Sequence, residues 1–365
     1  MKKTISLLNW PNGAINLKHS GGLDVVEFYQ LKELNKYYDA NLYAKKIIGK
    51  QNNMKVIKSV NINFLSSYDL YYYYNFYQET KNSWVIIGYN APLICLFRQK
   101  NTFIYYHNVL RFLGKYGVKF LPFYKLFMNK YNQCKYIFVS NYVKNQFVKK
   151  YPNVPHKNLF VLLNFVDNSC IKKRTRFYKE TDVKKIIFAG VWNQLKGFDE
   201  LINAVVNLRK KRTDFELHLI GGFDLWEKTR KKIEIPPVDY IKVIGKKTHE
   251  DCLKYMHNMD IIVVPSKWAE PFGLVAIEGL ANQLITIISD RGGLAEIIDE
   301  GVNGFKFSYE HKPSLIEVIN KVLDLSPTSQ KHIRNNGLKK VESLYTLNNN
   351  ITLLRRIIEA NSKDD

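Results

Sequence analysis

The sequence predicts an α/β fold made of two Rossmann-like domains that face each other across a cleft, and three observations carry this prediction. The chain has 365 residues, 46% of them hydrophobic, which is enough to bury two cores of ordinary domain size. Short apolar runs of strand-like composition alternate with helix-like stretches. After a polar segment without periodicity, residues 168–183, this alternation starts a second time.

The first series of apolar runs predicts the strands of an N-terminal domain, residues 1–167. These runs are KKTISLLNW, NLYAKKI, SWVIIGYN, TFIYYHN and YIFVSN. Helical patterns such as DVVEFYQLKELNKYY and NYVKNQFVKKY lie between them. Because strands and helices that alternate in this way form βαβ units, we expect a parallel sheet covered on both faces.

The second series predicts a C-terminal domain over residues 184–340, joined to the first domain by the linker 168–183. Its strand candidates are KKIIFAG, FELHLIGG, YIKVIG, DIIVVPS and LITIISD. The remaining residues, 341–365, contain a helical pattern from about 347 to 361 that can pack back on the N-terminal domain. Since ligands of open α/β sheets bind outside the carboxyl ends of the strands, functional residues are expected there.

Cysteine usage and hydropathy favour a cytoplasmic protein. The four cysteines lie far apart and form no CxxC pair, which argues against a disulfide framework and against a structural metal site. The first apolar run is only about five residues long, shorter than the core of a signal peptide. No stretch approaches the roughly 18 to 20 apolar residues that span a bilayer.

The formal net charge of +22 has two explanations that the sequence leaves open. Abundant Lys, Asn, Ile and Tyr are typical of compositional drift, which adds lysines without a function. Against drift, residues 80–166 hold thirteen Lys or Arg and no Asp or Glu. We therefore expect a basic face in this segment that lies on an anionic membrane surface, with an ordinary packed helix and a solvated lysine face as the alternative.

The stretch PSKWAEPFGLVAIEG, residues 265–279, places two carboxylates around a turn between a predicted strand and a predicted helix. Phe272, Gly273 and Leu274 lie where the helix begins, and the free N–H groups of a helix start suit a phosphate. Glu270 precedes the turn and Glu278 follows about one turn into the helix. Because carboxylates pair well with diols, the pattern predicts a sugar on one side of a phosphate and a ribose on the other.

The residues around this stretch resemble the signature of glycosyltransferase family 4, also called glycosyl transferases group 1, whose members are retaining nucleotide-sugar enzymes with the GT-B fold. The resemblance runs through SKWAEPFGLVAIE, IISDRGGLAEII and GVNGF, residues 266–305. It implies that Glu270 faces the transferred sugar, residues 272–274 the diphosphate and Glu278 the ribose. Gly292 and Gly293 belong to the same signature, where they shape the neighbouring turn.

Two further segments of the C-terminal half resemble the same family. FAGVWNQLKGF, residues 188–198, is similar to the strand-turn in which an Arg and a Lys grip the donor diphosphate. Lys196 is then the phosphate cation, while Val191 occupies the position of the Arg. IGKKTHEDCLKY, residues 244–255, resembles the segment that recognises the nucleotide base, which places Lys246 and Lys247 near the base.

In the N-terminal half, the resemblance places two elements near the donor. Gly21 and Gly22 follow the first strand and can form a tight turn that approaches the donor phosphates. His107 ends a predicted strand where the family often has a His-Asp pair, and Asn108 stands in place of the Asp. The resemblance implies that His107 contacts the donor sugar or the charge that develops on it.

The family resemblance implies a hexosyltransferase that moves a sugar from a UDP-, GDP- or ADP-sugar to a glycan or lipid-linked glycan, in the synthesis of lipopolysaccharide, capsule or another cell-surface polysaccharide. In the mechanism proposed for the family, the leaving diphosphate helps to deprotonate the acceptor, so Glu270, His107 and Lys196 are the catalytic candidates. The chain contains no Asp-x-Asp motif, and we expect neither a metal nor another cofactor.

Two alternatives remain open at this point. Val191 in place of the usual Arg is compatible with a catalytically silent family member that acts as a partner subunit. The basic charge with interleaved aromatic residues is also found in proteins that bind single-stranded nucleic acid, although no nucleic-acid motif is present and no nucleic acid is expected. The favoured location is the cytoplasm, with a peripheral association at the inner face of the membrane.

Overall fold

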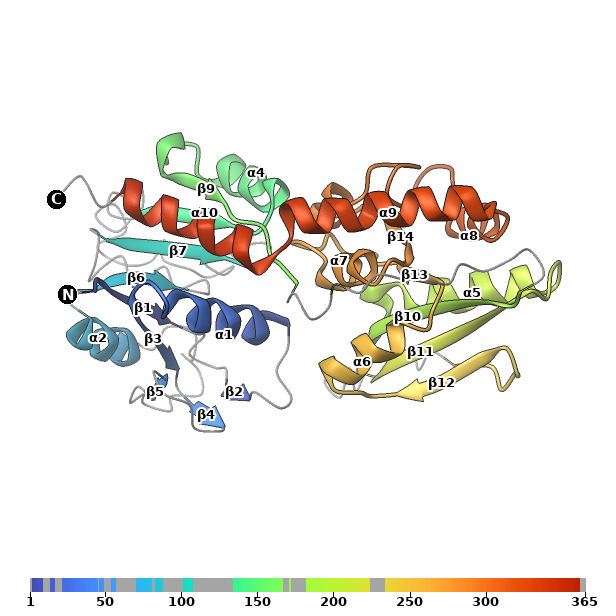
Figure 1. The fold of residues 1–365 in the computed structure, drawn as a ribbon, viewed down its shortest axis with the longest axis horizontal. Helices are drawn as coiled ribbons and strands as arrows, with labels where there is room; N and C mark the ends of the chain where they lie inside the picture. Colours follow the sequence, from blue (N-terminus) through green and yellow to red (C-terminus); the bar gives the residue numbers. More distant parts are fainter. Residues whose placement is uncertain are drawn as a thin grey trace. The chain divides into compact units, whose positions relative to one another are not determined.

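A computed structural model of the protein describes residues 2–8, 14–16, 22–44, 46–48, 54–56, 70–80, 83–87, 101–107, 134–166, 171, 182–223 and 234–361. Contacts divide the chain into two compact units (Figure 1). The first unit comprises Met1–Asn164 together with Leu347–Asp365, and the second comprises Phe165–Thr346. Residues 341–346, assigned above to the C-terminal segment, therefore belong to the second unit.

The first unit contains a seven-stranded parallel sheet with the strand order β5-β3-β1-β6-β7-β8-β9. Its strands are β1 (Thr4–Leu8), β3 (Asp39–Ala44), β5 (Met54–Val56), β6 (Trp84–Ile87), β7 (Thr102–Tyr106), β8 (Lys135–Phe138) and β9 (Leu159–Val161). A separate parallel pair joins β2 (Ala14–Asn16) to β4 (Lys46–Ile48). Each of the five predicted runs contains a strand of this unit, whereas β2, β5 and β9 were not predicted.

The helices of the first unit include the last helix of the chain. They are α1 (Gly22–Leu34), α2 (Leu70–Glu79), α4 (Asn141–Lys150), the short 3₁₀ helix η4 (His156–Asn158) and α10 (Leu347–Ala360). α10 packs against α1, and the Asn350 side chain on α10 accepts a hydrogen bond from Gln30 Nε2 at 2.9 Å. Asn350 also donates to the Leu163 carbonyl at 2.8 Å, which ties α10 to the end of the first stretch of the chain.

The second unit contains a six-stranded parallel sheet with the strand order β12-β11-β10-β13-β14-β15. Its strands are β10 (Lys184–Trp192), β11 (Phe215–Phe223), β12 (Ile241–Gly245), β13 (Ile261–Val264), β14 (Ile285–Ser289) and β15 (Phe305–Phe307). Numbered within the unit, this order is 3-2-1-4-5-6, the Rossmann arrangement. The five predicted strands are confirmed, and the three-residue β15 was not predicted.

The strand order of the second unit reverses between β10 and β13. β11 and β12 lie on one side of β10 in the sheet, and β13, β14 and β15 lie on its other side. Helices on opposite faces diverge at such a point and leave a crevice outside the carboxyl ends of the two strands. The loops after β10 and β13 are therefore placed where a ligand of this unit is expected.

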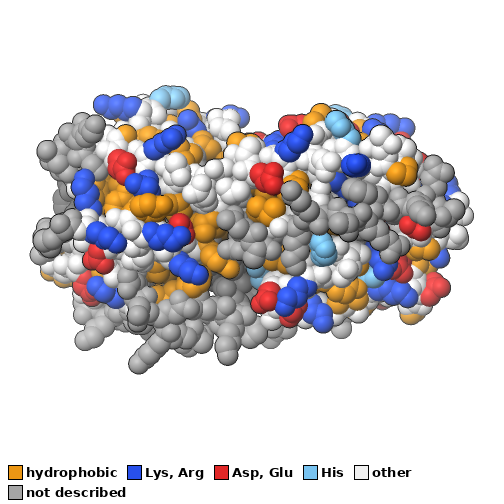
Figure 2. Space-filling view, in the orientation of Figure 1, with side chains coloured by type: hydrophobic (Ala, Val, Ile, Leu, Met, Phe, Trp, Pro, Cys, Tyr) orange, Lys and Arg blue, Asp and Glu red, His pale blue; other side chains and the backbone are white. Residues whose placement is uncertain are grey.

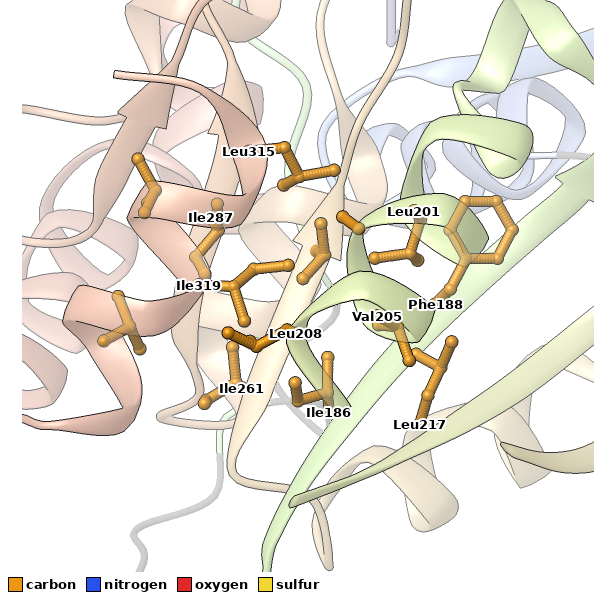
Figure 3. Close-up of a cluster of buried hydrophobic side chains, with 14 of the residues drawn as sticks. Ile186, Phe188, Leu201, Val205, Leu208, Leu217, Ile261, Ile287, Leu315 and Ile319 are labelled. Carbon is orange, nitrogen blue, oxygen red and sulfur yellow. The ribbon is translucent and has the colours of Figure 1, made fainter. Parts of the chain in front are cut away.

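Helices cover both faces of the second sheet. They are η6 (Gln194–Lys196), α5 (Phe198–Arg209), α6 (His249–Met256), α7 (Leu274–Ala281), η7 (Gly292–Glu296), α8 (Leu315–Leu323) and α9 (Pro327–Leu344). α5 and α8 pack together over one face, in a core that contains Ile261 and Ile287 (Figure 3). α7 covers the other face, since a Cβ added at Gly279 would touch Ile262 and Thr286, which alternate with those core residues.

Polar caps set where several of these helices begin. The Ser140 hydroxyl accepts from Val143 N at 3.2 Å at the start of α4, and Thr248 accepts from Asp251 N at 3.2 Å at the start of α6. At α8, Ser314 and Glu317 form a reciprocal capping box. These side chains satisfy N–H groups that have no partner within the helix.

The predicted basic face of residues 80–166 falls largely outside the described residues, because residues 88–100 and 108–133 are not among them. On the face shown in Figure 2, Lys and Arg side chains of the described residues lie among Asp and Glu side chains. Within the described part of the chain, none of the helices combines the length and the apolar character that a membrane crossing requires.

Candidate functional site

The carboxylate of Glu270 lies in the loop that follows β13, and it has two side-chain partners there. Glu270 is 9% exposed. Its Oε1 atom accepts hydrogen bonds from the Ser266 hydroxyl and from the Lys196 ammonium, the latter at 2.9 Å. A buried carboxylate is stable only when its charge is compensated, and Lys196 supplies the compensation. The structure thus brings together two predicted site residues that are 74 positions apart.

The Lys196 loop is held against the Glu270 loop by backbone contacts. The Leu195 carbonyl accepts from the backbone N–H groups of Lys267 at 2.9 Å and of Trp268 at 3.2 Å. Gly197, at φ +67°, packs so closely on Pro265 that an added Cβ would lie 1.7 Å from the Pro265 carbonyl oxygen. Both loops leave the sheet at the reversal of strand order, so their contact forms the floor of the expected crevice.

Local interactions also fix the position of the Lys196 side chain. The Asn193 side chain caps η6 by accepting from Lys196 N at 2.9 Å. The ammonium lies 5.5 Å from the centre of the Trp268 ring, within the range of a cation–π contact. The lysine side chain is about one third exposed, so its N–H groups face both the carboxylate and solvent. When an anion enters, the Lys196 ammonium can bind it in place of part of its interaction with Glu270.

The glycine pair at 292 and 293 supports the backbone of Glu270. Gly293 N donates to the Glu270 carbonyl at 2.7 Å. Gly292 adopts φ +63°, and a Cβ there would lie 2.4 Å from the Glu270 carbonyl oxygen. The pair begins the 3₁₀ helix η7 directly after β14, where it shapes the turn beside the Glu270 loop.

Residues 272–274 form the start of α7, with Gly273 as its N-terminal cap. The Phe272 ring is buried and packs edge-on against Tyr345, with ring centres 5.8 Å apart. The ring therefore serves packing, and the groups that this turn offers to a ligand are backbone N–H groups at the start of α7.

Glu278 lies on α7, one turn beyond its start, and its side chain pairs with a residue that the sequence did not single out. Glu278 is 9% exposed, and its Oε1 atom lies 2.8 Å from Nε2 of His249, the first residue of α6. Cys252 is one turn further along α6. Burial and the charge of Glu278 raise the pKa of the Cys252 thiol to about 12, which keeps it neutral near pH 7.

His249 lies within residues 244–255, the segment that resembles the base-recognition segment of the family, but nothing in the sequence indicated that Glu278 is its partner. The two residues are 29 positions apart on different helices, and only the packing of α6 beside α7 brings them together. By holding Oε1, His249 leaves the second oxygen of Glu278 available to accept a hydrogen bond from a bound hydroxyl.

We expect His249→Leu to raise the KM for the donor by about three- to tenfold with little change in kcat, since the loss of one hydrogen bond leaves Glu278 poorly oriented. Steady-state kinetics with varied donor concentration measures this. Lys254→Ala removes an exposed side chain of the same helix and serves as the control. A fall in kcat at constant KM would show that His249 acts on the chemical step instead.

The remaining predicted residues of the second unit lie at other strand ends. Lys246 and Lys247 are exposed and follow β12 directly. Val191, 39% exposed, is near the end of β10. None of these three residues contacts Glu270 or Glu278 in any hydrogen bond or ion pair among the described residues.

Two predicted residues of the first unit are described. His107 follows β7 directly, is 9% exposed and packs at a tilt against Tyr105, with ring centres 3.9 Å apart. Burial lowers the pKa of His107 to about 3, so the imidazole is neutral near pH 7. Neither ring nitrogen has a hydrogen-bond partner in the described part of the chain. Gly22 is the first residue of α1, whereas Gly21 and Asn108 lie outside the described residues.

Comparison with known proteins adds a family and a set of relatives. Residues 171–340 match the model of the family described as Glycosyl transferases group 1. An uncharacterized glycosyltransferase of Methanocaldococcus jannaschii is 32% identical over 193 residues, which cover 52% of this chain and 50% of that protein. The lipopolysaccharide 1,2-N-acetylglucosaminetransferase of Salmonella typhimurium is 27% identical over 210 residues, 53% of this chain and 54% of the relative. The matched part thus spans about half the length of these curated relatives.

A solved structure extends the likeness to the first unit. The Anabaena protein HepE in complex with UDP-glucose superposes with a TM-score of 0.70 at 16% identity, covering 99% of each chain. At 16% sequence identity, this comparison is evidence for the fold alone.

Proposed function

Because residues 171–340 match the model of the glycosyl transferases group 1 family and the whole chain has the GT-B fold that the sequence predicts, we propose that the protein is a retaining glycosyltransferase. It moves a sugar from a nucleotide-diphosphate sugar to a glycan or glycolipid acceptor. The observation that carries this proposal is the pairing of Lys196 with Glu270 at the reversal of strand order, 2.9 Å apart.

The proposed roles follow from the chemistry of each group. Lys196 binds the diphosphate and stabilises the charge that develops on it as the sugar leaves. Glu270, freed from part of its pairing with Lys196, accepts hydrogen bonds from hydroxyls of the transferred sugar. The N–H groups at residues 272–274 bind the phosphate, and Glu278 binds the ribose through the oxygen that His249 does not hold.

His107 is proposed to contact the donor sugar. A neutral imidazole whose nitrogens have no hydrogen-bond partner among the described residues can donate one hydrogen bond and accept another, which suits a sugar hydroxyl. We propose that Gly21 and Gly22 approach the donor phosphates through their backbone. Transfer is proposed to need no metal and no further cofactor, since the sequence has no Asp-x-Asp motif and Lys196 offers the diphosphate a cation.

The acceptor is proposed to be a lipid-linked glycan or a lipopolysaccharide core. The name of the Salmonella relative, a lipopolysaccharide 1,2-N-acetylglucosaminetransferase, supports this class of acceptor. A peripheral association with the inner face of the membrane stays a prediction from the basic segment 80–166. The second candidate, a silent partner subunit that binds donor without turning it over, is favoured only by Val191.

A panel of UDP-, GDP- and ADP-sugars tests the proposal by thermal unfolding and by slow donor hydrolysis. We expect one nucleotide class to raise the Tm by several degrees at 100 times its Kd, because ligand binding stabilises the folded state by about 2.7 kcal/mol at that concentration. Hydrolysis of the same donor would exclude the silent-subunit alternative. If no nucleotide sugar shifted the Tm, the proposed function would be wrong.

A further inference from the structure

The carboxyl ends of β10, β11 and β12 lie side by side, and the middle strand has two glycines, Gly221 and Gly222, just before its last residue, Phe223. β11 pairs with β10 on one side and with β12 on the other. Near the end of β11, Gly221 pairs with Gly190 and Gly222 with Val191. Lys246 follows the last residue of β12.

The methylene groups of Lys246 fill the space that a side chain at position 222 would occupy. A Cβ added at Gly222 would lie 2.9 Å from Cε of Lys246 and 3.4 Å from Cγ. Paired residues on adjacent parallel strands point to the same face, and neighbouring strands are about 4.8 Å apart. The Lys246 side chain therefore lies next to Val191, one strand spacing from the end of β10.

Three of the other cations around this end of the sheet are engaged by carboxylates, whereas the exposed Lys247 has no carboxylate partner among the described residues. Lys196 pairs with Glu270 at 2.9 Å. Lys267 pairs with both Asp199 and Glu200, each at 2.9 Å, and Arg291 pairs with Glu310 at 2.9 Å. Lys246 has no carboxylate partner among the described residues. Within the described part of the chain, its positive charge beside the apolar Val191 is therefore not compensated by a carboxylate.

Lys196 and Lys246 approach the end of β10 from opposite sides. The Lys196 loop follows β10 and leans on the β13 side, since Gly197 packs on Pro265. Lys246 arrives from the β12 side across Gly222. A diphosphate carries more negative charge than one lysine can offset, above all when that lysine is shared with Glu270.

We propose that Lys246 is the second cation that binds the donor diphosphate, and that it supplies from β12 the positive charge that Val191 cannot supply from β10. The inference rests on the proposed function and gives Lys246 a phosphate contact in place of the base contact predicted from the sequence.

Calorimetric titration of Lys246→Ala with a nucleoside diphosphate and with the matching nucleoside tests this role. The probe is UDP, GDP or ADP, whichever binds the wild-type protein best, compared with uridine, guanosine or adenosine. We expect diphosphate affinity to fall about ten- to hundredfold, the usual effect of losing one charged hydrogen bond, while nucleoside affinity stays unchanged. Lys242→Ala, which removes the same charge from an exposed position on the same strand, is expected to bind both probes like the wild type.

A rescue variant tests whether the position of the positive charge at the end of β10 accounts for the affinity. Because Gly222 and Val191 are register partners, Val191→Arg in the Lys246→Ala background returns a cation to the same end of β10 and is expected to recover most of the lost affinity. Equal losses for the diphosphate and the nucleoside would show a base contact and overturn the inference, as would unchanged diphosphate affinity. Wild-type protein that bound no nucleoside diphosphate would overturn the proposed function and this inference together.

Discussion

Replacement of Lys196 by alanine is expected to lower kcat by about a hundred- to a thousandfold, the cost of removing one preorganised group that stabilises transition-state charge. The leaving diphosphate would lose the cation that the structure holds at the reversal of strand order. The same substitution leaves Glu270 buried with its charge uncompensated, so the free energy of unfolding should also fall. Product formation under donor saturation and urea unfolding measure the two effects separately.

Glu270→Gln distinguishes these two effects. In the Lys196→Ala background it removes the uncompensated carboxylate, so it should recover stability but not turnover. Lys210→Ala, on the exposed end of α5, is the control and should change neither quantity by a measurable amount. If the double variant regained turnover along with stability, the loss of turnover in Lys196→Ala would come from the uncompensated charge of Glu270 and not from a lost contact with the diphosphate.

Gly197→Ala is expected to destabilise the second unit by more than about 4 kcal/mol, which places it among the most damaging single substitutions. A Cβ at this position would lie 1.7 Å from the Pro265 carbonyl oxygen and 2.5 Å from the Tyr309 hydroxyl. Relief of the overlap requires the Lys196 loop and the Glu270 loop to separate. Urea unfolding followed by tryptophan fluorescence reports the loss, because Trp192 and Trp268 lie in and beside these loops.

Gly301→Ala provides the matched control for that substitution. Gly301 has nearly the same backbone angle, φ +72° against +67°, but no atom lies within 4 Å of an added Cβ. It should therefore cost only the roughly 1 to 2 kcal/mol of a left-handed non-glycine residue. Equal losses in both variants would mean that backbone conformation, and not the contact with Pro265, accounts for the effect.

Much of the fold could be predicted because parallel strands buried on both faces read as continuous apolar runs. The strands missed in the two units, β2, β5, β9 and β15, have only three residues each, too short for such a run to stand out. The end of the second unit was less well predicted, since residues 341–346 pack with that unit for reasons that lie in tertiary contacts.

The candidate site was predictable where its residues are close in sequence and not where folding assembles it. The loop that carries Glu270 could be read as a strand-to-helix turn. The partner of Glu278 could not, because His249 reaches it from another helix. The position of Lys246 beside Val191 depends on the register of β10 with β11, which no local pattern encodes.

The division of the chain has a consequence for the order in which the protein is completed during synthesis. The second unit is one continuous stretch, Phe165–Thr346, whereas the first needs α10 from the end of the chain. The buried face of α10 includes Ile351, Leu354 and Ile358, and α10 packs against α1, so this part of the first unit stays open until the ribosome has made α10. The unit that is synthesised first is therefore the last to close its core, and part of its apolar surface stays exposed throughout the translation of the second unit.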